Sequence, residues 1–247
     1  MKTRYLALPG VMLLLAAALI SLPASWGDAW LERASHGRWR LLDARGTVWD
    51  GSATPAFVGA DGQVLPLARI GWSWQGRPFW SGRLAWRLDG AGDGARIELG
   101  RRALRLDRVS LRVPTAALAG LDEAWRNAGL GGDVSVELAH LAWSDGRFDG
   151  GAHLEWAAAS SVLSSEMPFG RYALEANADG AGLALHLATL SGPLNLDGAG
   201  RWQPGLPPQM AGRAESPPEH DAALKPLLLM LGQPDSPNGV SWRLRPG

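Results

Sequence analysis

The sequence has no cysteine. This absence excludes a disulfide framework, a zinc site built on thiolates and a thiol nucleophile. It does not identify the redox compartment, because a chain without thiols suits a reducing or an oxidising one. An excess of charge is missing as well, since 24 Lys and Arg balance 24 Asp and Glu. Nucleic-acid binding needs a basic surface that neutralises phosphates, so we expect no nucleic acid as a partner.

Motifs for catalysis and cofactor binding are also missing. The five histidines are scattered, and neither a pair at metal-ligand spacing nor a His-Glu-x-x-His motif occurs. There is no Gly-x-Ser-x-Gly elbow, no P-loop and no dinucleotide-binding glycine motif. Residues 89–94 combine Asp and Gly, but they lack the later glutamate of a calcium loop and fit a hairpin turn better. We therefore predict a protein that is not an enzyme and that has no cofactor, nucleotide or metal.

Tyr and Phe are scarce in this chain, whereas Trp and Gly are abundant: 2 Tyr, 4 Phe, 13 Trp and 32 Gly. Hydrophobic residues make up 46% and charged residues 19%, which is the composition of a folded protein with an apolar core. The 247 residues suit one large domain or two small ones. Because Gly favours turns and Trp favours strands and amphipathic boundaries, the composition indicates β structure.

The longest apolar run lies at the N-terminus. Residues 5–22 carry no charge, and their length is just enough for a helix to cross roughly 30 Å of hydrocarbon. Two basic residues precede the run, which predicts a cytoplasmic N-terminus and an exported remainder by the positive-inside rule. A cleaved signal peptide is the alternative, but a cut after Ala24 would put the large Leu22 three positions before it. Both interpretations place residues 25–247 outside the cytoplasm.

We favour the uncleaved anchor, so the chain is expected to be a single-pass membrane protein whose body lies outside the cytoplasm. Residues 1–24 would form a cytoplasmic stub and a transmembrane anchor, which contacts the membrane through residues 5–22. Residues 25–36 would be a juxtamembrane segment, and residues 37–247 a β-rich domain outside the cytoplasm.

After this anchor, apolar and polar residues alternate with period two in short runs, the pattern of strands with one dry and one wet face. The runs are 84–88, 104–106, 109–113, 134–138, 172–175, 183–187 and 240–245. They are separated by Asp-Gly or Gly-Gly pairs at 89–90, 93–94, 131–132, 145–146, 149–150, 179–180 and 197–198. Because Asp-Gly between alternating strands favours a hairpin, we predict a mainly β, antiparallel fold, either a twisted sheet or a sandwich.

Two segments have helical spacing instead. Residues 114–129 begin with Pro, end with Gly and carry apolar residues on one face. Residues 216–232 begin with a Ser-x-x-Glu capping box and continue with a leucine stripe, and Pro226 is expected to kink or split this helix. A boundary near 114–132 would divide the body into two β halves. One continuous sheet is the alternative, and the sequence leaves both open.

Tryptophan next to a glycine turn recurs along the chain, and most tryptophans fall on the apolar side of a strand, where core packing is expected. Trp72 with Trp74, and Trp80 with Trp86, are the exceptions, because a Trp-rich surface there would be a protein-binding hot spot. Two further tryptophans, at 26 and 30, lie where an interfacial aromatic anchor would sit.

Several segments resemble the type II secretion system protein N family. The first is LLDARGTVWDGSA (41–53), whose Gly-Thr-Val-Trp-Asp-Gly core is the most specific, and the second is ARIGWSWQGRPFWSGRLAWRL (68–88). Further similar segments are LRVPTAALAGL (111–121), MPFGRYAL (167–174), SGPLNLDGAGRW (191–202) and LLLMLGQPDSPNGVSWRL (227–244). With the short basic N-terminus and the single apolar run, the resemblance spans nearly the whole chain.

The resemblance implies an accessory, single-pass inner-membrane component of the machine that exports folded proteins from the periplasm across the outer membrane. It also implies that residues 37–247 form a periplasmic β-rich domain. No catalytic activity is associated with the family, so no catalytic residues are carried over. The family's motif residues correspond to Gly46, Trp49 and Gly51, which either set a hairpin or bind a partner. A separate cytoplasmic ATPase supplies the energy of such systems, which agrees with the missing nucleotide motif.

Three functions remain open at this point. The first is a structural and interaction subunit of the type II secretion system that contacts other inner-membrane or periplasmic subunits, the secretin among the candidates, through strand edges or a Trp patch. The second is a lipid-binding or envelope-maintenance protein of AsmA-like style, because both strand faces near residues 183–196 are apolar or small. The third is a periplasmic hydrolase whose residues converge only in space, which no motif supports.

Overall fold

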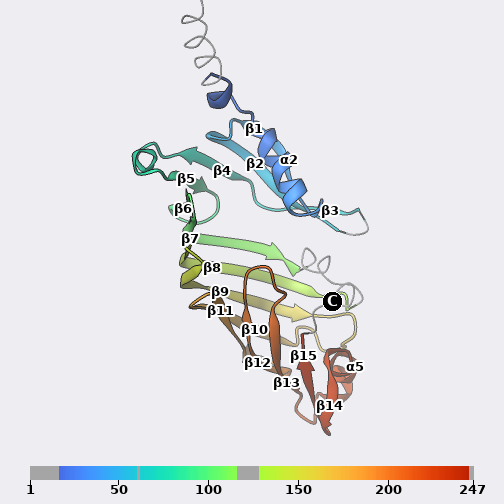
Figure 1. Cartoon of the computed structure of the whole chain (residues 1–247). Coiled ribbons are helices and arrows are strands. Elements are labelled where there is room, and N and C mark those ends of the chain that lie inside the picture. Colours follow the sequence, from blue (N-terminus) through green and yellow to red (C-terminus); the bar gives the residue numbers. More distant parts are fainter. Residues whose placement is uncertain (1–16, 60–61, 116–127, 245–247) are drawn as a thin grey trace, which may run out of the picture.

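The computed structural model describes residues 17–59, 62–115 and 128–244, and its main feature is one antiparallel sheet of fifteen strands (Figure 1). The strands are β1 (Trp39–Gly46), β2 (Asp50–Val58), β3 (Val64–Pro66), β4 (Ile70–Trp74), β5 (Leu84–Asp89), β6 (Ala95–Gly100), β7 (Ala103–Pro114), β8 (Gly131–Ser144), β9 (Arg147–Ser160), β10 (Gly170–Asp179), β11 (Gly182–Ser191), β12 (Asn195–Trp202), β13 (Gln209–Glu215), β14 (Gln233–Ser236) and β15 (Gly239–Arg243). Beside them lie the helices α2 (Ser25–Ala34) and α5 (Asp221–Leu231) and the 3-10 helix η1 (Arg77–Ser81).

The sheet is an open meander, in which most strands pair with the next strand along the chain. The order runs β1-β2-β4-β5 and then without interruption to β13, followed by β15 and β14. The short strand β3 pairs with the C-terminal part of β2. The predicted mainly β, antiparallel fold is therefore confirmed. The alternating runs seen in the sequence lie in β5, β7, β8, β10, β11 and β15.

The predicted turns are only partly correct. Asp145 and Gly146 join β8 to β9, and both have the positive φ values, 49° and 81°, that a tight Asp-Gly hairpin requires. The pairs at 131–132, 149–150 and 197–198 are not turns, because they lie inside β8, β9 and β12. Gly198 serves packing instead, since a Cβ at this position would overlap the indole ring of Trp242 on the same face.

The C-terminal helix α5 is shorter than the predicted 216–232. It begins at Asp221 rather than at the Ser-x-x-Glu box, and the hydroxyl of Ser216 hydrogen-bonds the Asp221 carboxylate at 3.3 Å instead of capping a backbone N–H. Pro226 lies inside the helix, which continues through it without being split. The leucine stripe is confirmed, because Leu224, Leu227 and Leu228 are nearly fully buried. Burial of each such side chain contributes about 1.5–3 kcal/mol.

Two predicted segments fall largely outside the described residues. These are the membrane anchor at 5–22, of which only residues 17–22 are described, and the helix at 114–129. Within the described ranges no helix has the length and hydrophobicity to cross a bilayer. The expected subdivision near 114–132 stays a prediction. The sheet itself runs on past this segment, since β7 pairs with β8 from Ala103 opposite Ser144 to Pro114 opposite Asp133.

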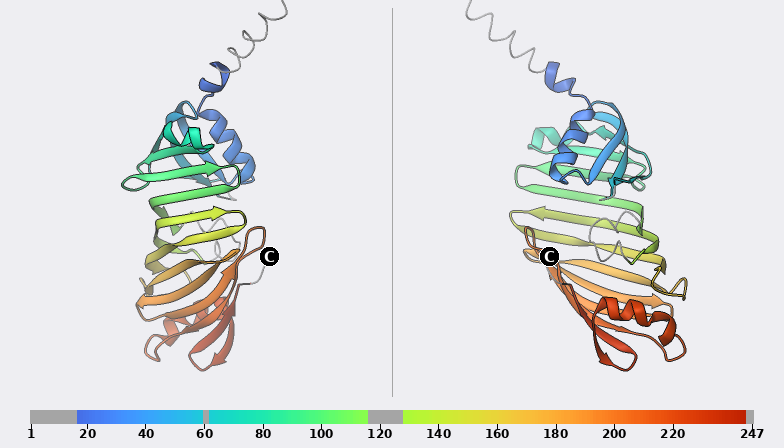
Figure 2. Two further views of the ribbon diagram at one scale, coloured as in Figure 1. Left: turned by 60° about the vertical axis from the view of Figure 1, so that its left-hand side comes forward. Right: turned by 90° about the vertical axis from the view of Figure 1, so that its right-hand side faces the viewer.

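Helices α2 and α5 lie on the same side of the curved sheet, at its opposite ends (Figure 2). The largest buried cluster is at the α5 end, where the helix packs on β13 and β15. The cluster includes Tyr172 of β10 and Val240 and Trp242 of β15. It also includes Phe169 and Leu194, from the loops that precede β10 and β12. At the other end α2 covers β1. The middle of the same face, over β5 to β9, has no described helix on it.

Candidate functional site

The candidate residues from the sequence gather at the N-terminal end of the sheet, in what we call the tryptophan cluster: Trp49, Trp72, Trp74 and Trp86. Trp49 stacks on Trp86 with ring centroids 6.3 Å apart and an interplanar angle of 13°. It meets Trp74 edge-on, with centroids 5.6 Å apart. The register brings these rings together, since Trp74 is directly opposite Trp86, and Trp72 is opposite Gly51. Each such aromatic pair is worth about 0.5–1.5 kcal/mol beyond its area burial.

The indole N–H groups of the cluster point at one short segment. Trp72 donates to the carbonyl oxygen of Thr47 at 3.0 Å, and Trp86 donates to that of Val48 at 3.1 Å. Both acceptors belong to the turn between β1 and β2, residues 46–51. The turn is therefore bound to the face of β4 and β5, and it does not project into solvent as a free hairpin loop.

Thr47 closes this turn by local hydrogen bonds. Its backbone N–H donates to the Asp50 carbonyl oxygen at 2.8 Å, and its hydroxyl accepts from the N–H groups of Trp49 and Asp50. Gly46 has φ +85°, and a Cβ there would overlap the Asp50 carbonyl oxygen. A Cβ at Gly51 would lie 2.8 Å from the Trp72 ring. Only glycine fits both positions, which explains the Gly-Thr-Val-Trp-Asp-Gly spacing physically.

The same turn holds the chain that follows the N-terminal apolar run. The N–H of Ala24 donates to the Gly46 carbonyl oxygen at 3.0 Å, and the N–H of Val48 donates to the Leu22 carbonyl oxygen at 2.9 Å. A third bond joins the Trp49 indole N–H to the carbonyl oxygen of Leu19 at 2.8 Å. Residues 19–24 are thereby fixed against the turn by three hydrogen bonds. The sequence did not predict this contact.

Helix α2 covers the outer edge of β1. The backbone N–H of Leu41 donates to Asp28 Oδ1 at 2.7 Å, and that of Trp39 donates to the Ser35 hydroxyl at 2.9 Å. Arg40 pairs with Asp28 at 3.0 Å, and its hydrogen bonds to this carboxylate lower the pKa of Asp28. At the other end of the sheet, β14 is four residues long and contains Pro234, which has no N–H to donate. Neither terminal strand therefore offers a long free edge for pairing.

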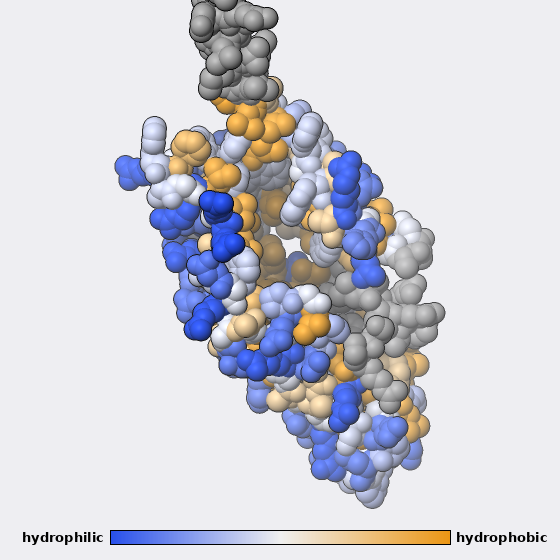
Figure 3. All heavy atoms as spheres, in the orientation of Figure 1, coloured by the Kyte–Doolittle hydropathy of each residue, from blue (hydrophilic) through white to orange (hydrophobic). Residues whose placement is uncertain are grey.

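One face of the sheet is apolar from end to end. Cross-strand partners share a face, and the register places an unbroken series of apolar side chains opposite one another between α2 and α5. From β5 to β11 this series, which we call the apolar face, comprises Leu84, Trp86, Leu88, Ile97, Leu99, Leu104, Leu106, Val109, Leu111, Val113, Val134, Val136, Leu138, Leu141, Trp143, Phe148, Leu154, Trp156, Tyr172, Leu174, Leu183, Leu185 and Leu187. Figure 3 shows hydrophobic residues gathered in the hollow between the two ends of the molecule.

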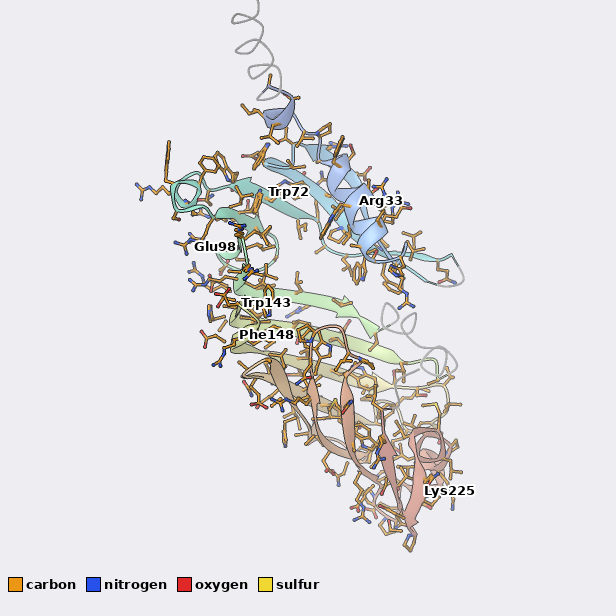
Figure 4. The ribbon with its side chains drawn as sticks, viewed as in Figure 1. Arg33, Trp72, Glu98, Trp143, Phe148 and Lys225 are labelled. Atoms are coloured by element: carbon orange, nitrogen blue, oxygen red, sulfur yellow. The ribbon has the colours of Figure 1, made fainter. Side chains whose placement is uncertain are left out.

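The middle of the apolar face is partly open to solvent, although Val134 and Leu138 of β8 are only 7% exposed. Leu99, Leu104 and Leu111 are 42%, 37% and 37% exposed, although they point to the side on which both helices pack. Trp143 and Phe148 are cross-strand partners on this face and lie on the neighbouring strands β8 and β9 (Figure 4). Exposed apolar surface of this extent, bordered by polar strand edges, is typical of an interaction or ligand-binding surface.

The opposite face is polar and holds the nearest approach to a catalytic pair. His140 Nδ1 is 2.6 Å from Asp107 Oδ1, and its Nε2 is 3.4 Å from Asp149 Oδ2. Both ring nitrogens thus face carboxylates, and among the described residues no Ser or Thr hydroxyl hydrogen-bonds a histidine. The described part of the chain also contains no group of three His, Asp or Glu side chains that could hold a metal ion. The Glu98 carboxylate, on the same face (Figure 4), pairs with Arg83 and Arg96.

The fold and these surfaces define a β-rich protein with an apolar face and a tryptophan cluster, the features of a protein that binds other molecules. Residues 37–243 match the family described as Type II secretion system (T2SS), protein N. The chain therefore belongs to the type II secretion system protein N family, as the resemblance predicted. Neither a curated protein nor a solved structure matches it. Family membership connects the chain with type II secretion and with protein transport in the cell envelope.

Proposed function

We propose that this protein is an accessory, non-catalytic subunit of the type II secretion system, anchored in the inner membrane by residues 5–22, with its body in the periplasm. It supports the export of folded proteins across the outer membrane by contacting other inner-membrane or periplasmic subunits, with the secretin among the candidates. The observation that carries the proposal is the family match over residues 37–243, combined with an apolar face that the described helices leave open.

The structure favours the apolar face over the sheet edges as the contact surface. The β1 edge is covered by α2, and β14 is short and contains Pro234, so strand addition at the ends has little backbone to pair with. Leu104 and Leu111 of β7, by contrast, present exposed apolar side chains near the centre of the face. The centre of a protein interface is its most apolar part, and the residues that contribute most to binding cluster there.

In-cell photocrosslinking tests this proposal. A photoreactive amino acid replaces Leu104 or Leu111, and the matched controls carry it at Arg105 or Arg112, which are exposed on the opposite face of the same strand. We expect covalent adducts with other secretion subunits at 104 and 111, and few at 105 and 112. If neither face yields a secretion subunit, and deletion of the gene leaves secretion unchanged, the proposed function is wrong.

A second candidate function is the binding of a lipid by the apolar face, as in an envelope-maintenance protein of AsmA-like style. It is favoured by the continuity of the face, because side chains from Leu84 to Leu187 form one uninterrupted apolar surface on which acyl chains could lie. The same crosslinking variants separate the two functions. A lipid-sized mass added at Leu104 or Leu111, with no protein adduct, would support lipid binding, and its absence from both positions would count against it.

A further inference from the structure

A group of exposed aromatic and aliphatic side chains lies at the N-terminal end of the body. It consists of Leu19, Ile20, Trp26, Phe79 and Trp80, which we call the aromatic rim. The Trp80 side chain is 90% exposed and that of Ile20 is 68% exposed, and the other three are more than half exposed. Burial of an indole normally contributes to stability, so a tryptophan held in solvent indicates a surface that is covered by another molecule in use.

The two parts of the aromatic rim, far apart in the sequence, are connected through Trp74 and Trp49 of the tryptophan cluster. The Trp80 ring meets the Phe79 ring, with centroids 6.0 Å apart, and Phe79 meets Trp74 at 6.2 Å. Trp74 contacts Trp49, whose indole N–H donates to the Leu19 carbonyl oxygen. A chain of rings therefore joins the η1 segment to residues 19 and 20. In Figure 1 both parts lie at the end of the molecule opposite α5.

The segment that presents Phe79 and Trp80 has a defined conformation. In η1, the Gly82 N–H donates to the Phe79 carbonyl oxygen at 2.9 Å, and the Arg83 N–H donates to the Pro78 carbonyl oxygen at 3.1 Å. Gly82 ends the turn in the left-handed conformation, with φ +72°. The exposure of the two rings is thus imposed by a closed turn, because these backbone hydrogen bonds fix the direction in which the rings point.

The segment that carries Phe79 and Trp80 has charged residues of one sign only. Residues 75–83 contain two arginines and no acidic residue. Arg77 is exposed and makes no ion pair with any described residue, whereas Arg83 lies 3.6 Å from Glu98. Exposed tryptophan beside arginine suits the boundary between lipid headgroups and hydrocarbon, where the indole is partly apolar and the guanidinium meets phosphate.

We propose that the aromatic rim lies in the headgroup region of the phospholipid bilayer, so that the body rests on the membrane surface. This rests on the proposed anchor, because the apolar run that ends at Leu22 enters the body within the rim itself, beside Leu19 and Ile20. A bilayer is therefore the one surface certain to be near these side chains if the anchor spans it. Trp26, Phe79 and Trp80, which lie outside the anchor, then make a second contact with the membrane, and the sheet stands away from the bilayer with α5 at its far end.

The test uses the full-length chain in phospholipid vesicles. Because the chain has no cysteine, Trp80→Cys introduces a single thiol for an environment-sensitive fluorophore. The matched control is Leu229→Cys, which is also more than half exposed but lies on α5 at the opposite end. We expect a blue-shifted emission at position 80, and quenching by brominated lipids at least about twofold stronger than at position 229. Ser81→Cys gives a second reading of the same turn if Trp80→Cys unfolds.

The possible outcomes distinguish a failure of the rim proposal from a failure of the proposed anchor. If the chain floats with the vesicles but the probe at position 80 is as accessible to water as the probe at position 229, the anchor is supported and the rim proposal is wrong. If the chain does not float with the vesicles, the anchor is wrong and the rim proposal fails with it. Protection of position 80 from aqueous quenchers without lipid quenching would show that protein covers the rim, and this also overturns the proposal.

Discussion

The indole N–H of Trp49 donates to the carbonyl oxygen of Leu19, thirty residues earlier in the chain, at 2.8 Å. This bond joins the centre of the Gly-Thr-Val-Trp-Asp-Gly turn to the segment that leaves the N-terminal apolar run. Trp49 also stacks on Trp86 and meets Trp74. One side chain therefore connects the N-terminal segment, the turn and the strands β4 and β5.

Replacing Trp49 by Phe tests the hydrogen bond separately from the ring packing. The phenyl ring keeps aromatic contacts but has no N–H, so we expect a loss of about 1 kcal/mol in the free energy of unfolding. Limited proteolysis should also cut more rapidly within residues 19–24. Trp202→Phe is the control, because the Trp202 ring contacts Phe148, whereas no side-chain hydrogen bond of Trp202 is seen among the described residues. Equal effects of the two substitutions would contradict a role for the Trp49–Leu19 bond.

Gly46→Ala should destabilise the protein by more than the strain of its left-handed backbone alone. Both Gly46 and Gly82 have positive φ, but only at Gly46 would a Cβ overlap another atom, the Asp50 carbonyl oxygen. We expect Gly82→Ala to cost about 1 kcal/mol from backbone strain, and Gly46→Ala to cost about 2–4 kcal/mol. Urea unfolding of the two variants measures the difference. A cost for Gly46→Ala no greater than for Gly82→Ala would show that the turn can shift to admit a side chain.

Tyr172→Phe should remove a buried hydrogen bond from the core beside α5. The Tyr172 hydroxyl donates to the Leu194 carbonyl oxygen at 2.9 Å, and without it this buried acceptor loses a partner, at an expected cost of about 1–2 kcal/mol. Phe169→Leu is a control that reduces ring packing nearby without removing a hydrogen-bond donor. A stability change within experimental error for Tyr172→Phe would mean that another donor reaches Leu194.

The same tyrosine predicts how stability depends on alkaline pH. Burial raises the pKa of Tyr172 above its ordinary value of about 10. A raised pKa means that the full stability is present below about pH 10 and is lost as pH rises beyond it, because the unfolded chain releases the proton first. In a Tyr5→Phe background Tyr172 is the only tyrosine, so absorbance at alkaline pH reports its ionisation. We expect ionisation to coincide with unfolding. Ionisation of the folded protein near pH 10 would contradict the prediction.

Asp28→Asn should loosen α2 from β1 and change the response to acid. Arg40 lowers the pKa of Asp28 through hydrogen bonds, and the Leu41 N–H adds to this effect. A lowered pKa means that this stabilisation is present above about pH 4 and is lost as pH falls through the folded-state value. At neutral pH we expect a loss of about 1 kcal/mol. Asp93→Asn is the control, since Asp93 is exposed. The variant's stability should fall less between pH 5 and pH 3 than that of the wild type.

Alternation in the sequence predicted six of the fifteen strands, and leucine spacing predicted α5, because both patterns are local properties. Helix α2 was missed, since it buries no residue fully, and it is held by Asp28 through Arg40 and Leu41, twelve and thirteen residues away. The Asp-Gly pair in β12 was taken for a turn, although its glycine makes room for Trp242. Such contacts depend on strand register, which a single sequence does not reveal.

The candidate site could likewise be predicted only in part from the sequence, because it too depends on strand register. The sequence identified Gly46, Trp49 and Gly51 as motif residues and singled out Trp72, Trp74 and Trp86 separately. It gave no reason for Trp49 to lie between Trp74 and Trp86, because this depends on the order β2-β4-β5 and on the turn folding back over the sheet. The apolar face was likewise visible only strand by strand. Its continuity appears once the pairing of each strand with the next is known.

The meander has a consequence for how the chain reaches its native state. Nearly every strand pairs with its successor, so each added strand closes only the turn that joins it to its neighbour, and the loop-closure entropy is small at each step. A strand can add to the growing sheet as soon as it is available, without waiting for a distant partner. If the body emerges from a translocation channel N-terminus first, β1 and β2 can pair early and later strands can join in order of arrival. The sheet can then form progressively, strand by strand, from its N-terminal end.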